Sequence, residues 1–264
     1  MKALLLAIFN YRGFIIGSVK RDFQSRYQTS MLGAIWLIIQ PLAMILVYTL
    51  IFSQVMKARL PGETGKYAYS IYLCSGILTW GLFAEIVGRS KNVFIDNSNL
   101  IKKMSFPKIC LPVIIVSTAV INFAIIFSLF AIFLIILGQF PFDRIFDLIA
   151  VLLIQITFSA GIGMIVGVLN VFFRDVGQLV DVLLQFLFWS TPIVYAIDII
   201  SDQLHSIVML NPMARIISSY QSIFVHQKSP EWSLLIPVVL ISIVCCCIGL
   251  ILFRKHSADM VDEL

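Results

Sequence analysis

The chain has 264 residues, of which 60% are hydrophobic and only 12% are charged, and its mean hydropathy is +0.99. Soluble domains have roughly a quarter of their residues charged, so this composition excludes a soluble globular protein and indicates a membrane protein. The net charge of +5 fits contact with anionic lipid and gives no reason to expect a nucleic-acid partner.

Residues 1–30 predict an amphipathic helix that lies in the membrane surface. A signal peptide is not expected, because the apolar stretch 3–9 is short and no small-residue cleavage site follows it. At about 100° per residue, one arc of the helix collects the apolar side chains, which are Leu5, Ile8, Phe9, Ile15, Ile16, Val19 and Phe23.

Six predominantly apolar segments of about 20 residues or more predict six membrane-spanning helices. They lie at 31–55, 68–88, 109–137, 145–169, 176–200 and 233–253. Six crossings put both termini on one side, and this side carries most of the 19 Lys and Arg residues, so the termini are expected in the cytoplasm. The expected fold is an all-α integral membrane protein with a single transmembrane domain over residues 1–264.

Segment 89–108, on the expected cytoplasmic side, is too long for a simple turn. It predicts a short amphipathic element that ends where Pro107 prevents a continued helix. This element could dock a partner protein. Composition alone is equally typical of a solvated loop with a cluster of positive charges.

Segment 201–232, on the expected outer side, contains two apolar pieces that are each too short to span a membrane. They lie at 207–210 and 213–225 and are separated by Asn211 and Pro212. Pro212 suits the first turn of the second piece, so we expect a re-entrant helical hairpin. A plain surface loop is the alternative.

The sequence offers no set of residues for catalysis or metal binding. His205, His226 and His256 are far apart in sequence and have no acidic or metal-ligand pattern around them. The five cysteines lie in or beside apolar segments, and three of them are the consecutive 245–247, as expected of small apolar filler. Carboxylates near the middle of the spans, which ion-coupled carriers use, are not found in the predicted spans.

Polar and small residues inside the predicted spans are expected to hold helices together. Amides within spans are typical of hydrogen bonds between helices, and small residues are typical of close helix packing. The amides are Asn122, Gln155 and Gln185, and the glycines are Gly161, Gly163 and Gly167.

Aromatic residues are frequent in the first, second and fifth predicted spans. Their faces can pack on the C–H faces of sugars, but packing against lipid or within an interfacial belt is an equally ordinary use. They include Trp36, Tyr48 and Phe52, then Trp80 and Phe83, and then Phe186, Phe188, Trp189 and Tyr195.

Five motifs in chain order resemble the membrane subunit of bacterial type-2 ABC polysaccharide exporters, which include the O-antigen, capsule and teichoic acid permeases. The first runs over 21–36 and continues into Gln40-Pro41. The others are 99–103 with Phe106-Pro107 and Pro112, then 173–176, then 190–195, and then 211–213. The resemblance covers essentially the whole chain.

The resemblance implies a permease that is not itself an enzyme, working in the bacterial inner membrane. It implies a homodimer that binds two copies of a separate nucleotide-binding ATPase, which would supply ATP and Mg, while this chain binds no cofactor of its own. The expected cargo is an undecaprenyl-diphosphate-linked polysaccharide, with O-antigen favoured. The alternatives are a secondary transporter or a membrane-embedded glycan-modifying enzyme.

The resemblance also assigns roles to residues of this chain. Coupling to the ATPase would fall to Asn92, Phe94, Ile95, Asn99, Leu100, Ile101, Lys102 and Lys103. The entrance for the lipid diphosphate would be formed by Lys20, Arg21, Arg26, Leu32 and Gly33. The glycan channel would use Trp36, Tyr48, Phe52, Phe186, Trp189 and Tyr195, and the periplasmic gate would use Asn211, Pro212 and Met213.

Overall fold

The computed structural model describes residues 6, 8–27, 35–51, 65, 67–103, 106–197 and 201–264, and within these it is a helical bundle without β-strands. The prediction of an all-α membrane protein is confirmed. The helices are α2 (Arg12–Tyr27), α3 (Trp36–Leu50), α4 (Ala68–Ser90), α5 (Val93–Asp96), α6 (Ser98–Lys103), α7 (Cys110–Ile136), η3 (Phe142–Arg144), α8 (Ile145–Phe172), α9 (Asp175–Ser190), α10 (Asp202–Val208), α11 (Pro212–Val225), α12 (Trp232–His256) and α13 (Asp259–Glu263).

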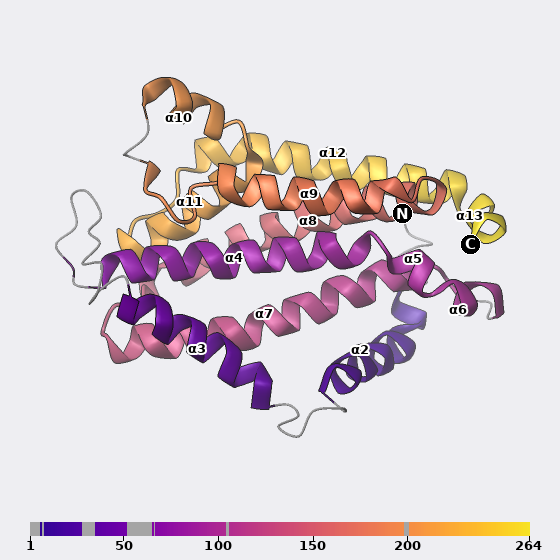
Figure 1. Cartoon of the computed structure of the whole chain (residues 1–264), viewed down its shortest axis with the longest axis horizontal. Helices are drawn as coiled ribbons and strands as arrows, with labels where there is room; N and C mark the ends of the chain where they lie inside the picture. Colours follow the sequence, from indigo (N-terminus) through magenta and orange to yellow (C-terminus); the bar gives the residue numbers. More distant parts are fainter. Residues whose placement is uncertain are drawn as a thin grey trace.

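Helix α4 runs through the middle of the bundle, with α3 and α7 on one side and α8, α9 and α12 on the other (Figure 1). The short helices α5, α6 and α13 gather at one end of the bundle, here called the α6 end. The opposite end, here called the α11 end, carries α10, α11 and the start of α4. The bundle therefore has two distinct ends, each with its own cluster of short helices.

Four helices of the described residues are long and apolar enough to cross a membrane: α4, α7, the segment Phe142–Phe172 and α12. They match four of the six predicted spans. Predicted spans 31–55 and 176–200 correspond to the shorter helices α3 and α9, which have 15 and 16 residues. At 1.5 Å per residue, α9 is shorter than the roughly 30 Å thickness of the hydrocarbon core, and so is the described part of α3, which borders residues outside the described ranges.

The expected end of the fifth span, at residue 200, is wrong, because α9 ends at Ser190. Thr191 is extended (φ −97°, ψ 139°), as favoured for a residue before proline, and Pro192 follows it. The backbone carbonyl of Pro192 accepts hydrogen bonds from Tyr72 Oη (3.0 Å) and Gln221 Nε2 (2.9 Å). Side chains of α4 and α11 thus replace the helical hydrogen bonds that α9 gives up.

The three glycines of α8 confirm the predicted close packing of helices. A Cβ added at Gly161 would lie 2.8 Å from the backbone nitrogen of Cys246 in α12. A Cβ added at Gly163 would lie 2.7 Å from Ser90 Oγ at the end of α4. A Cβ added at Gly167 would lie 2.6 Å from the backbone carbonyl oxygen of the same serine. The glycines therefore let α4 and α12 approach the backbone of α8 closely.

Two of the three predicted interhelical amide contacts are present. Gln155 Nε2 donates to the carbonyl of Thr79 at 2.7 Å, and Asn122 Nδ2 donates to Glu85 Oε2 at 2.8 Å. The prediction for Gln185 is wrong, because this residue lies on the exposed face of α9 and makes no such bond within the described part of the chain. The five cysteines are free, as expected.

The outer segment forms two helices, as expected, and they have different environments. α11 is part of the main core, where Met213, Ile216, Ile217, Tyr220 and Ile223 are almost fully buried, and this excludes a plain surface loop for 212–225. α10 is exposed along most of its length. The core position of α11 is compatible with the re-entrant interpretation.

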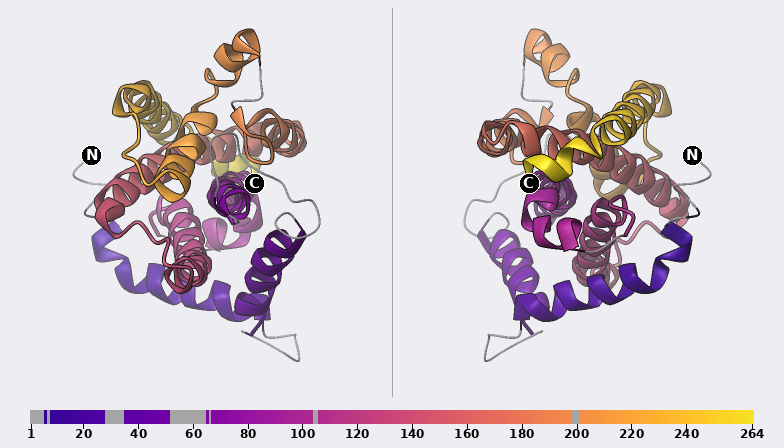
Figure 2. Two further views of the ribbon diagram at one scale, coloured as in Figure 1. Left: turned by 90° about the vertical axis from the view of Figure 1, so that its left-hand side faces the viewer. Right: turned by 90° about the vertical axis from the view of Figure 1, so that its right-hand side faces the viewer.

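Helix α2 crosses the bundle transversely near the α6 end, as Figure 2 shows in views along the long axis. Its predicted apolar arc is divided between two surroundings. Ile15 and Val19 are buried against Cys110 at the start of α7, whereas Phe9 and Ile16 are 63% and 67% exposed. This arrangement suits a helix that lies along a membrane surface.

Candidate functional site

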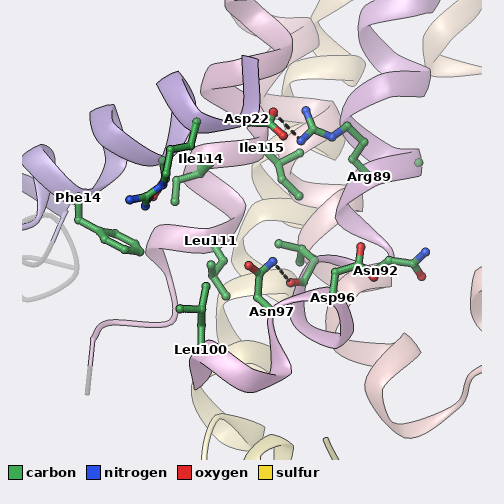
Figure 3. Close-up of a pocket in the computed structure, with 14 residues that line it drawn as sticks. Phe14, Asp22, Arg89, Asn92, Asp96, Asn97, Leu100, Leu111, Ile114 and Ile115 are labelled. Atoms are coloured by element: carbon green, nitrogen blue, oxygen red, sulfur yellow. Dashed lines mark hydrogen bonds and ion pairs between the residues drawn. The ribbon is translucent and has the colours of Figure 1, made fainter. Parts of the chain in front are cut away.

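A pocket of about 490 Å³ lies at the α6 end, between α2, the last turns of α4, α5–α6 and the start of α7 (Figure 3). We call it the inner pocket. Its apolar wall comes from α7, with Leu111, Ile114 and Ile115. Its polar residues come from three different elements and include Ser18, Arg21, Asp22, Arg89, Asn92 and Asn97.

A chain of charged and polar side chains begins in the inner pocket, at Asp22 and Arg89, and continues beyond it to Glu85 and Asn122. Arg89 Nη2 lies 2.8 Å from Asp22 Oδ2 in α2, and Arg89 Nη1 lies 3.5 Å from Glu85 Oε1. Glu85 in turn accepts from Asn122 of α7. Sequence reasoning missed this chain; the only signal for it was the spacing of Glu85 and Arg89 by four residues on one helix.

The contact between Asp22 and Arg89 joins the surface helix to the core bundle. The two side chains are 25% and 29% exposed, and ion pairs with this degree of exposure contribute only about 0–1 kcal/mol. The contact is therefore weak enough to be displaced by a competing anion.

The structure separates the residues predicted for the lipid-diphosphate entrance. Arg21 lines the inner pocket, where its Nη2 donates to Ser18 Oγ at 2.9 Å. The neighbouring Lys20 is exposed and does not line the pocket. Arg26 is the penultimate residue of α2, but its side chain is outside the described part, as are Leu32 and Gly33.

The predicted coupling segment divides into an anchor and an exposed face. Phe94 is fully buried and stacks on Phe253 of α12 at 5.9 Å, and Ile101 is 7% exposed. Ile101, which was predicted to couple to the ATPase, is therefore part of the anchor and not of the exposed surface. The exposed residues, here called the coupling face, are Asp96, Asn99, Leu100, Lys102 and Lys103. Ile95 is half-buried.

The C-terminal segment braces the anchor. Met260 of α13 is fully buried in the same cluster as Phe94 and Ile101. The ammonium group of Lys108 donates to the carbonyl of Ser257, and burial lowers the pKa of Lys108 while nearby Asp262 opposes this shift. The coupling face is thus supported by a small core of its own.

Asn170 ties three helix ends together behind the coupling segment. Its Nδ2 donates to the carbonyl of Lys91 at 2.8 Å and to Asn92 Oδ1 at 3.1 Å, and its Oδ1 accepts from the backbone nitrogen of Gly177 at 2.7 Å. Lys91 continues the network, with its Nζ 2.5 Å from Asp181 Oδ2. Asn92, predicted to contact the ATPase, therefore takes part in an internal hydrogen-bond network.

Replacing Asn170 with leucine is expected to lower the free energy of unfolding by about 1–3 kcal/mol, because it removes the three hydrogen bonds of a buried amide. It should also expose segment 91–103 to proteolysis at lower protease concentrations. Thermal unfolding and limited proteolysis of the purified protein measure both effects. Gln178→Leu is the control, since Gln178 is exposed on α9. Unchanged proteolysis of Asn170→Leu would contradict the assigned role.

The residues predicted for the glycan channel do not form one cluster. Phe186 and Trp189 are 68% and 63% exposed on α9, and Trp36 is 43% exposed at the start of α3. Tyr48 packs against the core and Tyr195 is half-buried, while Phe52 lies outside the described residues. The exposed aromatic residues therefore lie on α3 and α9, which both contact α4.

The predicted gate residues begin helix α11. Asn211 caps the helix, since its side chain accepts from the backbone nitrogen of Met213 at 3.0 Å, and Pro212 occupies the first turn as expected. Asn211 Nδ2 also donates to Thr191 Oγ1 at 2.9 Å. Asn211 therefore joins α11 to the non-helical segment after α9.

Among the described residues, no group of three or more His, Cys, Asp or Glu side chains is arranged to hold a metal ion. The inner pocket instead offers guanidinium, carboxylate and amide groups beside an apolar wall. Such a set can bind the polar head of an amphipathic molecule, and it lacks the nucleophile–base pair that covalent catalysis needs.

Comparisons with known proteins agree with these features. Residues 15–225 match the family model described as ABC-2 type transporter. The chain is 30% identical over 266 residues to the O-antigen export system permease protein RfbA of Myxococcus xanthus, covering 100% of both chains. It is 29% identical over 245 residues to a protein of the same name from Klebsiella pneumoniae, covering 92% of each. It is 22% identical over 247 residues to the polysialic acid transport protein KpsM of Escherichia coli, covering 92% of this chain and 93% of that protein.

Proposed function

This chain belongs to the ABC-2 type transporter family, and we propose that it is the channel-forming permease of an ATP-driven exporter that moves a lipid-linked polysaccharide from cytoplasm to periplasm. The observation that carries this proposal is the full-length similarity to an O-antigen export permease, and O-antigen is accordingly the favoured cargo. The chain is a membrane subunit rather than an enzyme, and ATP hydrolysis in such systems lies on a separate subunit. In this proposal, all six apolar segments cross the inner membrane and both termini are cytoplasmic.

The coupling face is the proposed contact for the ATPase, with two ATPase copies serving a homodimer of this chain. It projects from the α6 end and rests on a buried anchor, so a push on α5–α6 would be transmitted to α12 through Phe94 and Phe253. Its exposed Lys102 and Lys103 would meet an acidic surface of the partner. ATP and Mg would bind to the partner alone.

The proposed half-channel lies between α3 and α9. These helices flank α4 (Figure 2), and α9 leaves an apolar face exposed, with Leu179, Val182, Phe186 and Trp189 more than half exposed. A second copy would cover part of this face. Trp36, Phe186 and Trp189 would then face a sliding sugar chain, to which aromatic surfaces offer contact with few strong hydrogen bonds.

The inner pocket is the proposed entrance for the diphosphate of the lipid carrier. Arg21 and Arg89 supply two guanidinium groups, which bind phosphate oxygens in a bidentate manner. The anion would displace Asp22 from Arg89, a contact that contributes little by itself. The apolar wall formed by α7 would accommodate the first part of the lipid chain.

The entrance proposal predicts that Arg21→Glu reduces export about tenfold or more, because it replaces a phosphate-binding cation by an anion. Lys20→Glu is the matched control, since it makes the same charge change on the adjacent residue outside the pocket, and a smaller loss is expected. Export is measured as surface polysaccharide per copy of inserted permease. Equal losses in the two variants would contradict a specific role for Arg21.

A deletion strain tests the function as a whole. Without this chain, lipid-linked polysaccharide should accumulate in the cytoplasmic leaflet and be absent from the periplasm, and the chain should co-purify with a nucleotide-binding protein. Periplasmic polysaccharide that persists in the deletion strain would contradict the proposal.

A further inference from the structure

A second polar cavity, of about 330 Å³, lies at the α11 end, and none of the roles assigned above uses it. We call it the outer pocket. It is enclosed by α10, one face of α11, the first residues of α12 and residues 196–197. Among the described residues, its charged or titratable side chains are Tyr72 of α4, His205, Arg215, His226 and Glu231.

The polar floor of the outer pocket comes from one stripe of α11. Arg215, Ser218, Ser219 and Ser222 are three, four and seven residues apart, so they share one face of the helix. The opposite face supplies Ile216, Ile217 and Ile223 to the core. Burial of the apolar face fixes the orientation of α11, and this orientation places the polar stripe in the pocket.

Arg215 is held in position without being neutralised. Its Nε donates to the carbonyl of Met209 at 2.6 Å and its Nη1 to the carbonyl of Leu234 at 3.1 Å. Both acceptors are neutral, and within the described chain Arg215 forms no ion pair. The pocket therefore contains a fixed guanidinium whose charge is available to an anion.

Ser218 supplies a second, independent sign of a ligand. Its Oγ is buried and has no hydrogen-bond partner among the described residues, although Ser218 lines the pocket. The large majority of buried side-chain polar atoms in proteins have a hydrogen-bond partner, so an unsatisfied hydroxyl group beside a cavity points to a partner that binds in that cavity. Arg215 and Ser218 are one helical turn apart and can bind the same group.

The surroundings of the outer pocket are apolar, which favours a lipid over a free ion or sugar. In and after α10, Leu204, Ile207 and Leu210 are 54%, 63% and 73% exposed. On the other side, α12 is a candidate membrane span that begins at Trp232, the residue type enriched at membrane interfaces. A polar head in the pocket would thus have apolar surface on both sides for its chains.

We infer that the outer pocket binds the phosphate group of a lipid in the outer leaflet, with Arg215 and Ser218 as its ligands. The phosphate oxygens accept from the guanidinium of Arg215 and from Ser218 Oγ, and His205 and His226 lie at the same cavity. Among the described side chains, Glu231 is the one carboxylate of the pocket, and it limits how much negative charge the site accepts. This inference rests on the proposed function for its physiological meaning, since the lipid carrier must end its passage at this side.

Thermal unfolding of the purified full-length permease in a neutral detergent tests this inference without the ATPase or transport. The probes are dihexanoylphosphatidylglycerol and farnesyl diphosphate. Two controls each lack one part of the ligand: inorganic phosphate has no lipid chain, and dihexanoylglycerol has no phosphate. The unfolding temperature should rise with both lipid phosphates and not with the other two. A larger rise with farnesyl diphosphate indicates the carrier lipid, whereas a larger rise with phosphatidylglycerol indicates a membrane phospholipid.

Ser218→Ala is the sharpest variant. It removes a hydroxyl that has no partner, so the unliganded protein should unfold at the same or a higher temperature, while lipid-phosphate affinity falls about tenfold. Arg215→Gln should abolish the rise with phosphatidylglycerol. It should abolish the rise with farnesyl diphosphate once Arg21→Gln also removes the diphosphate site proposed for the inner pocket. Arg144→Gln, which removes another cation at the same end of the bundle but outside the pocket, should retain the rise.

Three results would overturn the inference: a ligand-induced rise in Ser218→Ala equal to that of the original protein, an equal loss of the rise in Arg144→Gln, or a rise with inorganic phosphate as large as with the lipids. Because the measurement involves no export, it separates this inference from the proposed function. Lipid binding with normal dependence on Ser218 in a protein that fails to export would refute the proposed function alone.

Discussion

Substituting serine for Asn99, Lys102 and Lys103 together is expected to reduce export at least about thirtyfold while leaving the helical bundle folded; Leu100 is kept because it also lines the inner pocket. These side chains are exposed, so their loss removes a contact surface and not core packing. Loss of one dominant interface residue weakens the binding free energy by about 2 kcal/mol or more, which corresponds to a roughly thirtyfold loss of affinity for the ATPase. Export per inserted permease, co-purification of the ATPase and thermal unfolding of the permease measure the three consequences.

The control for this variant is serine at Arg254 and Lys255, which removes two exposed cations from the end of α12 at the same end of the bundle. Near-normal export is expected there. Ile101 is left unchanged because it is buried, and Ile101→Ala should act on stability through the lost core contacts. Normal export by the triple serine variant would show that the ATPase binds elsewhere.

Gly167→Ala is expected to destabilise the protein by about 1–3 kcal/mol or more, which would greatly reduce the amount of folded permease in the membrane. The added Cβ would lie 2.6 Å from the carbonyl oxygen of Ser90 and 3.4 Å from Phe94, so it would separate α8 from α4 and disturb the anchor of the coupling segment. Thermal unfolding in detergent and the amount of inserted protein measure the effect.

Gly81→Ala is the matched control for this second variant. Gly81 lies in α4 and its added Cβ would meet no atom within 4 Å, so the substitution should be neutral or slightly stabilising. Gly163→Ala should also destabilise the protein, because its added Cβ would lie 2.8 Å from Ser90 Cβ, which side-chain rotation cannot move. If Gly167→Ala unfolded at the temperature of Gly81→Ala, the close approach of α4 and α8 would be contradicted.

Residue identity predicted the features that depend on local physics. Apolar length predicted the helices that became α4, α7, α8 and α12, because a helix is the way a single segment satisfies its own backbone in lipid. The glycines of α8 and the place of Pro212 in the first turn of α11 were recognisable because small size and a fixed φ have the same effect in any context. The motifs were sufficient to suggest the family that the comparisons establish.

Individual site residues were less predictable, because their roles depend on which face of a helix is covered. Lys20 and Arg21 are adjacent and chemically alike, yet only Arg21 lines the inner pocket. Ile101 and Leu100 are both apolar, yet one is buried and the other is on the coupling face. Gln185 has the same amide as Gln155 but faces away from the described bundle.

The sequence by itself determined that this chain is a helical membrane protein with short amphipathic elements between its spans, because hydropathy and length depend on composition alone. Only the tertiary structure decided that α9 ends at Ser190, that Asp22, Arg89, Glu85 and Asn122 form one chain of contacts, and that Arg215 and Ser218 face a common cavity. These features join residues that are distant in sequence, and no local pattern specifies which of the possible helix faces meet. The packing of α4, α8 and α11 around the core makes that choice, and it places both polar pockets at opposite ends of the bundle.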